Sequence, residues 1–77
     1  MNTTEVYELL EDKLKDKNEI EEEEFYKLVG DTSPLLCEST YRFLMAIDSL
    51  YAHGWTREER VEDGMKKIYY KRNNTTS

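Results

Sequence analysis

Cys37 and His53 are the only cysteine and the only histidine in the chain, which makes them the first candidates for nucleophilic or acid–base chemistry. A cysteine nucleophile needs a base beside it. These two lie 16 positions apart, about 24 Å along one helix at 1.5 Å per residue. A lone cysteine also allows no internal disulfide and no cysteine-based zinc cluster. We therefore expect Cys37 to be buried and inert, and His53 to cap a helix just before Gly54.

The densest charged run is formed by Glu21, Glu22, Glu23 and Glu24. Such a run could bind a cation or form an acidic face that imitates the phosphates of DNA. Acidic residues also stabilise the first turn of a helix and face water there, and we favour this second interpretation. The three glycines are widely spaced and form no phosphate-binding loop. We expect no catalytic residue, no metal and no cofactor, so the predicted protein is not an enzyme.

The composition limits the chain to one small domain. Its 77 residues include 17 Asp and Glu against 11 Lys and Arg, a net charge of -6, and 38% are hydrophobic. Residues 1–38 carry twelve acids and four bases, a net of -8, whereas residues 39–77 carry five and seven, a net of +2. The chain has no apolar run of the roughly 18 residues that a membrane span needs, and no secretory signal pattern. We expect a cytoplasmic protein that makes no membrane contact.

Two helices are predicted in the acidic half. Apolar residues recur at i, i+4 and i+8 from Val6, which indicates an amphipathic helix over residues 4–16 with Thr4 as its N-cap. A second, shorter helix follows the glutamate run and should end at Gly30. Between the two helices, Ile20 is isolated among polar residues and could form one rung of a short strand.

Ser33 and Pro34 give the clearest helix start, because Ser can cap and Pro fits the first helical position. The helix that follows is predicted to be the longest and to end at Gly54. At 100° per residue, one apolar stripe lies within about 60° of Ile47 and should form the centre of the core. The other residues of this stripe are Leu36, Thr40, Phe43, Leu44, Leu50 and Tyr51.

The opposite face of this helix is predicted to be exposed. It holds Tyr41 and Met45, which are i, i+4 neighbours and would form a small apolar spot. An exposed Tyr–Met spot beside an arginine is typical of protein-binding faces, although the end of the chain could instead fold over it. The candidate partner-binding residues are Tyr41, Arg42, Met45 and Ser49; Glu38 and Ala52 share the face.

Two interpretations compete for residues 55–72. The run at 56–59, Thr-Arg-Glu-Glu, matches a capping box that would open another helix. Asp63-Gly64 is instead a strong hairpin-turn signal, and the Ile-Tyr-Tyr run at 68–70 favours a strand. We favour a two-stranded hairpin.

The predicted order is helix, strand rung, helix, helix, hairpin. This is a mainly α (α+β) class: a three-helix winged-helix-like domain with a C-terminal β-hairpin over residues 1–72, followed by a disordered polar tail at 73–77. The run at 43–54, FLMAIDSLYAHG, resembles the pattern F-x-x-A-(L/I)-D-x-L-Y-x-x-G of the small middle components of bacterial ABC-ATPase three-component systems. The resemblance extends over about residues 33–70. It implies a winged-helix-like protein that accompanies an ATPase and a third protein in defence against mobile genetic elements.

A winged helix raises the question of DNA binding, which depends on phosphate neutralisation by Lys and Arg. The sequence pI of about 4.7 is far from the basic footprint of a small DNA-binding domain. Autonomous nucleic-acid binding is therefore not expected. The hairpin has the best-placed cations, interleaved with four acids, and its candidate wing contacts are Arg60, Lys66, Lys67 and Arg72.

Three functional hypotheses follow. The leading one is a non-enzymatic adaptor that binds another protein, such as an ATPase-containing complex. The first alternative is an acidic, phage-type inhibitor that imitates DNA through the glutamate run. The second is a dimeric winged-helix transcription regulator that uses its hairpin, and a homodimer stays open in each case.

Overall fold

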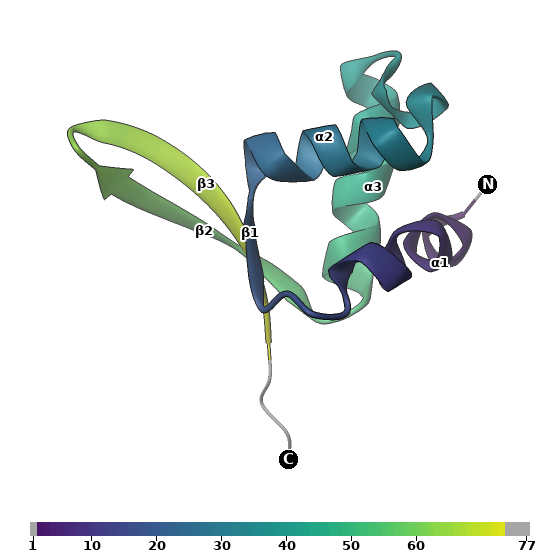
Figure 1. Cartoon of the computed structure of the whole chain (residues 1–77), viewed down its shortest axis with the longest axis horizontal. Helices are drawn as coiled ribbons and strands as arrows, with labels where there is room; N and C mark the ends of the chain where they lie inside the picture. The colour runs from purple at the N-terminus through teal and green to yellow at the C-terminus, as the bar shows by residue number, and fades with distance from the viewer. Residues whose placement is uncertain (1, 74–77) are drawn as a thin grey trace.

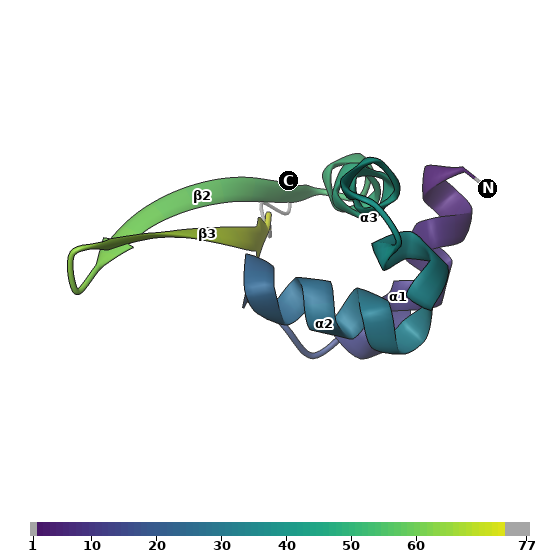
Figure 2. The same ribbon diagram turned by 90° about the horizontal axis from the view of Figure 1, so that it is seen from above.

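The computed structural model describes residues 2–73, which fold as three helices and a three-stranded sheet (Figure 1). The predicted α+β class is confirmed, with three helices and a C-terminal hairpin in winged-helix-like order. The hairpin extends away from the helices in both views (Figure 2). The elements are α1 (Thr3–Leu14), β1 (Glu19–Glu21), α2 (Glu22–Thr32), the 3-10 turn η1 (Pro34–Cys37), α3 (Thr40–Ala52), β2 (Trp55–Glu62) and β3 (Met65–Arg72).

The sheet is antiparallel, with strand order β1-β3-β2. The predicted strand rung is confirmed, because Ile20 pairs with Tyr70 at the centre of β1. The two strands of the hairpin pair without a break along their whole length, so the capping-box interpretation of residues 56–59 is wrong. Asp63 and Gly64 have φ values of 53° and 76°, as a two-residue type I′ turn requires.

The first helix begins slightly earlier than predicted. Asn2, and not Thr4, is its N-cap, because the Asn2 side chain accepts a hydrogen bond from the Glu5 amide at 2.9 Å. At the other end, Arg72 of β3 donates to the Leu14 carbonyl at 2.8 Å. A cationic donor at the last carbonyls of a helix satisfies groups that have no partner within the helix.

The second helix runs past Gly30 to Thr32, so the prediction that Gly30 ends it is wrong. The position does not require glycine, since a Cβ there would meet the Cys37 Sγ atom of η1 at 3.6 Å, an ordinary van der Waals contact. The helix ends where Thr32 turns its hydroxyl back to the Leu28 carbonyl at 2.9 Å.

The predicted long helix is interrupted near its start. Pro34 begins only the short 3-10 turn η1, and α3 starts afresh after Ser39, whose Oγ accepts from the Arg42 amide at 3.2 Å. The other end is as predicted: the backbone N–H of His53 donates to the Leu50 carbonyl at 3.0 Å, and Gly54 follows with a φ of 90°.

The third helix is rotated about its axis relative to the prediction. Its buried residues are Phe43, Ala46, Ile47, Ser49 and Leu50. At 100° per residue, their mean direction lies about 70° from Ile47. The reason is that α1 packs against α3 with the Tyr7 ring stacked on His53, which at 100° per residue lies in the direction of the alanine and serine of this set.

This rotation overturns several predicted positions. Thr40, Leu44 and Tyr51 belong to the predicted core stripe but are exposed. Ser49, predicted to face solvent, is completely buried. Its hydroxyl donates to the Ala46 carbonyl at 2.6 Å, which supplies the hydrogen bond that a buried hydroxyl needs.

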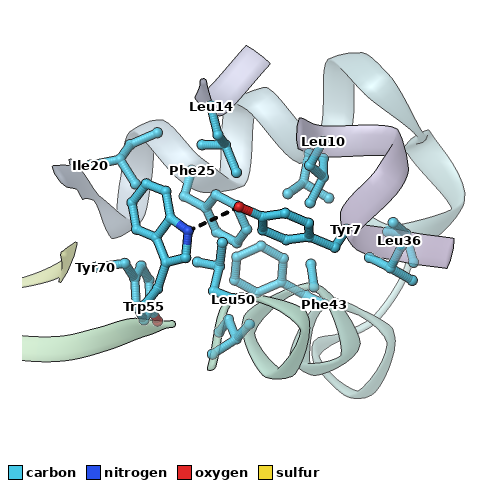
Figure 3. Close-up of a cluster of buried hydrophobic side chains, with 14 residues drawn as sticks. Tyr7, Leu10, Leu14, Ile20, Phe25, Leu36, Phe43, Leu50, Trp55 and Tyr70 are labelled. Carbon is cyan, nitrogen blue, oxygen red and sulfur yellow. Dashed lines mark hydrogen bonds between the residues drawn. The ribbon is translucent and has the colours of Figure 1, made fainter. Parts of the chain in front are cut away.

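The core joins side chains from every element of the fold, and Trp55 lies where the helices meet the sheet (Figure 3). Trp55 is 2% exposed, and its Nε1 donates to the Tyr7 hydroxyl of α1 at 3.2 Å. The Arg72 guanidinium lies 4.6 Å from the Trp55 ring, a cation–π contact. The Tyr7 ring also stacks on His53 at 4.0 Å.

The predicted polar tail lies almost wholly outside the described residues. Asn73 is the exception: its backbone N–H donates to the Gly54 carbonyl at 2.8 Å, which continues the pairing beyond the end of β3. Residue 73 is therefore part of the folded domain, and the prediction for residues 74–77 lies outside the part that the structure describes.

Two glycine substitutions should change stability in opposite directions. Gly64→Ala places a Cβ on a residue with a φ of 76° and should lower the free energy of unfolding by about 1–2 kcal/mol. Gly30→Ala replaces a glycine inside a helix with only an ordinary contact at 3.6 Å, and should raise it by about 0.5–1 kcal/mol. Urea unfolding measures both, and a destabilised Gly30→Ala would contradict the packing described for η1.

Candidate protein-binding face

Four residues form the exposed side of α3, which is called the α3 face below: Tyr41, Leu44, Asp48 and Tyr51. They recur at i, i+3, i+7 and i+10, so they line one side of the helix. The three apolar members are 81%, 46% and 42% exposed, in chain order. The only basic residue of α3 is Arg42, which pairs with Glu38 at 3.7 Å. The α3 face is therefore apolar and aromatic, with one carboxylate and no cation.

A groove of about 400 Å³ lies between α2 and α3. It is lined by Glu22, Glu23, Tyr26, Lys27 and Phe43. The Tyr26 ring, 47% exposed, packs edge-on against Phe43 at 5.0 Å. A second hollow of about 270 Å³ adjoins Tyr26 beside the start of α3. Tyr26 and Phe43 line both hollows.

The α3 face and this groove adjoin through Tyr51. Its ring lies 6.2 Å from the ring of Tyr70, whose hydroxyl donates to Glu22 at 2.5 Å. Burial raises the pKa of Tyr51; Arg57 opposes this rise, while Asp48 and Glu22 add to it. The phenol therefore stays neutral at physiological pH and remains a hydrogen-bond donor.

The structure corrects the predicted partner-binding set. Tyr41 and Arg42 are exposed as expected. Met45 is only half-exposed because it packs on the core, so the predicted Tyr–Met spot is reduced to its tyrosine. Ser49 is buried and cannot contact a partner.

The apolar pattern predicts Leu44 and Tyr51 in the core and gives no prediction for Tyr26, yet all three are exposed. The apolar stripe on α3 is wide enough that periodicity alone places Leu44 and Tyr51 in the core. One signal could have placed them correctly: Ala46 and Ser49, small residues three positions apart, mark a side that a second helix can approach closely.

The predicted wing cation Arg60 is held within the sheet. Its guanidinium donates to both Glu19 carboxylate oxygens, at 2.9 and 3.1 Å, and also pairs with Glu58. The same group lies 4.1 Å from the centre of the Tyr69 ring. Hydrogen bonds to Arg60 lower the pKa of Glu19, and those to Glu19 and Glu58 raise the pKa of Arg60. A phosphate would have to displace two carboxylates to reach this side chain.

The other three predicted wing contacts are also engaged. Lys66 pairs with Glu59 at 3.2 Å. Lys67 lies 3.7 Å from each of two carboxylates, one on β1 and one on β2. Arg72 donates hydrogen bonds to the carbonyls of Leu14 and Lys17, at and just after the end of α1. Among the hairpin cations of the described chain, Lys71 and Arg72 make no ion pair, and Arg72 donates to backbone carbonyls instead.

The glutamate run divides into two parts. Glu21 pairs with Lys67 at 3.7 Å, and Glu22 accepts the Tyr70 hydroxyl, so these two contribute to the fold. Glu23 and Glu24 are exposed and make no ion pair within residues 2–73. The helix-start interpretation fits the run, since α2 begins at Glu22.

Cys37 and His53 have structural contacts. Cys37 is half-buried with its Sγ 3.6 Å from the Tyr26 carbonyl, and burial raises the pKa of the thiol. The His53 ring Nδ1 lies 2.8 Å from the Ser49 carbonyl, as expected for a helix cap. Within residues 2–73, no group of three or more His, Cys, Asp or Glu side chains is placed to hold a metal ion.

Comparisons with protein-family models, with curated proteins and with solved structures find no match to this chain. Across residues 2–73, every helix is too short or too polar to cross a membrane. The α3 face with its groove is the candidate binding surface of this domain.

The ion pairs on the sheet predict a pH dependence. Hydrogen bonds from Arg60 hold the pKa of Glu19 below its unfolded value, so this pair stabilises the fold above the unfolded pKa. The stabilisation is lost as pH falls through the folded pKa, between about pH 5 and pH 2.

We therefore expect Glu19→Gln to lose less stability on acidification than the wild type. Glu8→Gln, on the exposed side of α1 with no ion pair in the described chain, is the control and should follow the wild type. Urea midpoints measured across this pH range test the prediction. Identical pH profiles for Glu19→Gln and the wild type would contradict it.

Proposed function

We propose that this protein is a non-enzymatic interaction module that binds another protein through the α3 face and the adjoining groove. One observation carries the proposal: the helix that would read DNA in a helix-turn-helix protein presents Tyr41, Leu44 and Tyr51 to solvent. Such a surface cannot neutralise phosphates. Exposed tyrosines are instead typical of the residues that dominate the affinity of protein interfaces.

The charges around this surface indicate what the partner looks like. Asp48 lies at the middle of the α3 face, and Glu22 and Glu23 line the groove. The one cation lining the groove is Lys27. The proposed partner therefore has an apolar patch with basic residues at its rim, because complementary charges favour association and select against wrong partners.

The resemblance to the middle components of ABC-ATPase systems supports the same conclusion. Its specific part, residues 43–54, coincides with most of α3 and its C-terminal cap. Under this proposal the protein acts in the cytoplasm as the adaptor of an ATPase-containing defence complex, and α3 is the element that joins it to that complex.

An acidic inhibitor is the second candidate. It is favoured by the exposed acids of α1 and α2 that make no ion pair within the described chain: Glu5, Glu8, Glu11, Glu23, Glu24 and Asp31. It is weakened by the apolar character of the α3 face, which a DNA mimic does not need. A transcription regulator that uses its wing is less well supported, because the four candidate wing contacts are engaged inside the domain.

Truncation of the α3 face tests the proposal. Tagged protein is recovered from the cell that expresses it, and the co-purifying proteins are identified by mass spectrometry. Tyr41→Ala and Leu44→Ala should each weaken the main complex about thirtyfold or more, because truncating a hot-spot residue costs about 2 kcal/mol or more and each 1.4 kcal/mol is about a factor of ten. Leu9→Ala is the matched control, since Leu9 on α1 is 44% exposed and Leu44 is 46% exposed.

The salt dependence of the complex separates the two candidates. A complex formed on the α3 face should persist at high salt and be lost in Leu44→Ala. A complex made by a DNA mimic should weaken steeply with salt and be indifferent to Leu44→Ala. Equal loss in Leu9→Ala and Leu44→Ala, or capture of DNA alone, would contradict the proposed function.

A further inference from the structure

The outer edge of β2 is an eight-residue strand edge with no neighbour. β2 is last in the strand order, so β3 covers one of its edges and nothing among residues 2–73 pairs with the other. Figures 1 and 2 show most of the hairpin lying clear of the helices. Proteins usually protect such an edge with charged side chains, a proline, a bulge or a covering segment, and of these devices β2 carries the charged side chains. β2 contains no proline, and its register with β3 is unbroken.

The turn decides which backbone groups face outward. A two-residue turn makes the flanking pair, Glu62 and Met65, a hydrogen-bonded pair, and bonded and non-bonded pairs then alternate along the hairpin. Glu58 therefore bonds to β3, whereas the N–H and C=O groups of Arg57, Glu59 and Val61 point away from it. The Arg72 amide supports this assignment of bonded and non-bonded pairs. It lies opposite Trp55 in the register but donates to the Asn18 carbonyl on the far side, at 2.7 Å.

We propose that a second copy of this chain pairs antiparallel with the free edge of β2, which joins two three-stranded sheets into one continuous sheet across a two-fold axis. In such a pair, outward-facing residues lie opposite outward-facing residues. The two-fold axis must then pass through a residue of β2, and the two residues at the middle of the strand are Glu58 and Glu59.

Charge complementarity is the reason for choosing a second copy as the occupant. With Glu58 on the axis, Arg57 of each copy lies opposite Glu59 of the other. With Glu59 on the axis, Glu58 of each copy lies opposite Arg60 of the other. Either register leaves one Glu–Glu pair at the axis, and each of these glutamates already has a cation of its own copy beside it. The pattern Arg-Glu-Glu-Arg thus provides two opposite-charge pairs in both registers.

This pairing surface is separate from the α3 face. It is made by backbone groups of the hairpin, whereas the α3 face is made by side chains of a helix. A dimer would present two α3 faces, and the inference does not depend on what those faces bind.

Two adjacent glutamates provide a matched pair of proline substitutions. In Glu59→Pro the lost N–H faces solvent in the monomer, so the hairpin should survive and the dimer should not. In Glu58→Pro the lost N–H bonds to β3, so the hairpin itself should be disrupted. Sedimentation equilibrium measures association, and circular dichroism measures folding.

The wild type should show a monomer–dimer equilibrium between micromolar and millimolar protein. Glu59→Pro should remain monomeric over the same range with a folded spectrum. A wild type that is monomeric throughout overturns the inference, as does a folded Glu59→Pro that dimerises like the wild type.

If Glu59→Pro fails to fold, disulfide cross-linking tests the proposed pairing of the two β2 edges. In a Cys37→Ser background, Glu58→Cys and Glu59→Cys each place a thiol at one candidate axis, and Glu8→Cys on α1 is the control. Mild oxidation should give a disulfide-linked dimer at one of the two β2 positions much faster than at the control. Equal rates at all three positions overturn the inference.

Discussion

The burial of Trp55 fixes the relation between the helices and the hairpin. Its indole nitrogen bonds to Tyr7 of α1, and Arg72 of β3 lies over its ring while bonding to the last carbonyls of α1. These contacts tie the first helix to both strands of the hairpin. Because Trp55 follows α3 after a two-residue cap, they also hold the end of α3 against α1. The side of α3 that α1 covers is thereby set, and so is the side that remains exposed.

The charged side chains fall into two groups: those paired within the sheet and those exposed on the helices. The cations of the hairpin are used almost entirely inside the sheet, against glutamates of β1 and β2 or against the end of α1. The acids of α1 and the start of α2 have few partners in the described chain. The result is an internally neutralised sheet beside acidic helices.

The sequence was sufficient where a local rule governs the structure. Asp63-Gly64 predicts the turn because both residues adopt a positive φ, and an isolated Ile20 predicts the third strand. It was insufficient where distant segments decide. Helical periodicity defines an apolar stripe, but which part of that stripe is buried depends on where α1 packs. Leu44 and Tyr51 were placed in the core and Ser49 on the surface for this reason. Pro34 correctly predicts the start of a helical turn, but that turn is the short η1, and α3 begins separately after it.

Site-specific photo-cross-linking in the native cell is the sharpest test of the proposal that the α3 face binds another protein. A photoreactive residue replaces Leu44 in one variant and the equally exposed Leu9 in another. We predict a discrete protein adduct from position 44 and none from position 9. The same adduct from both positions, or an adduct with nucleic acid alone, would contradict the account.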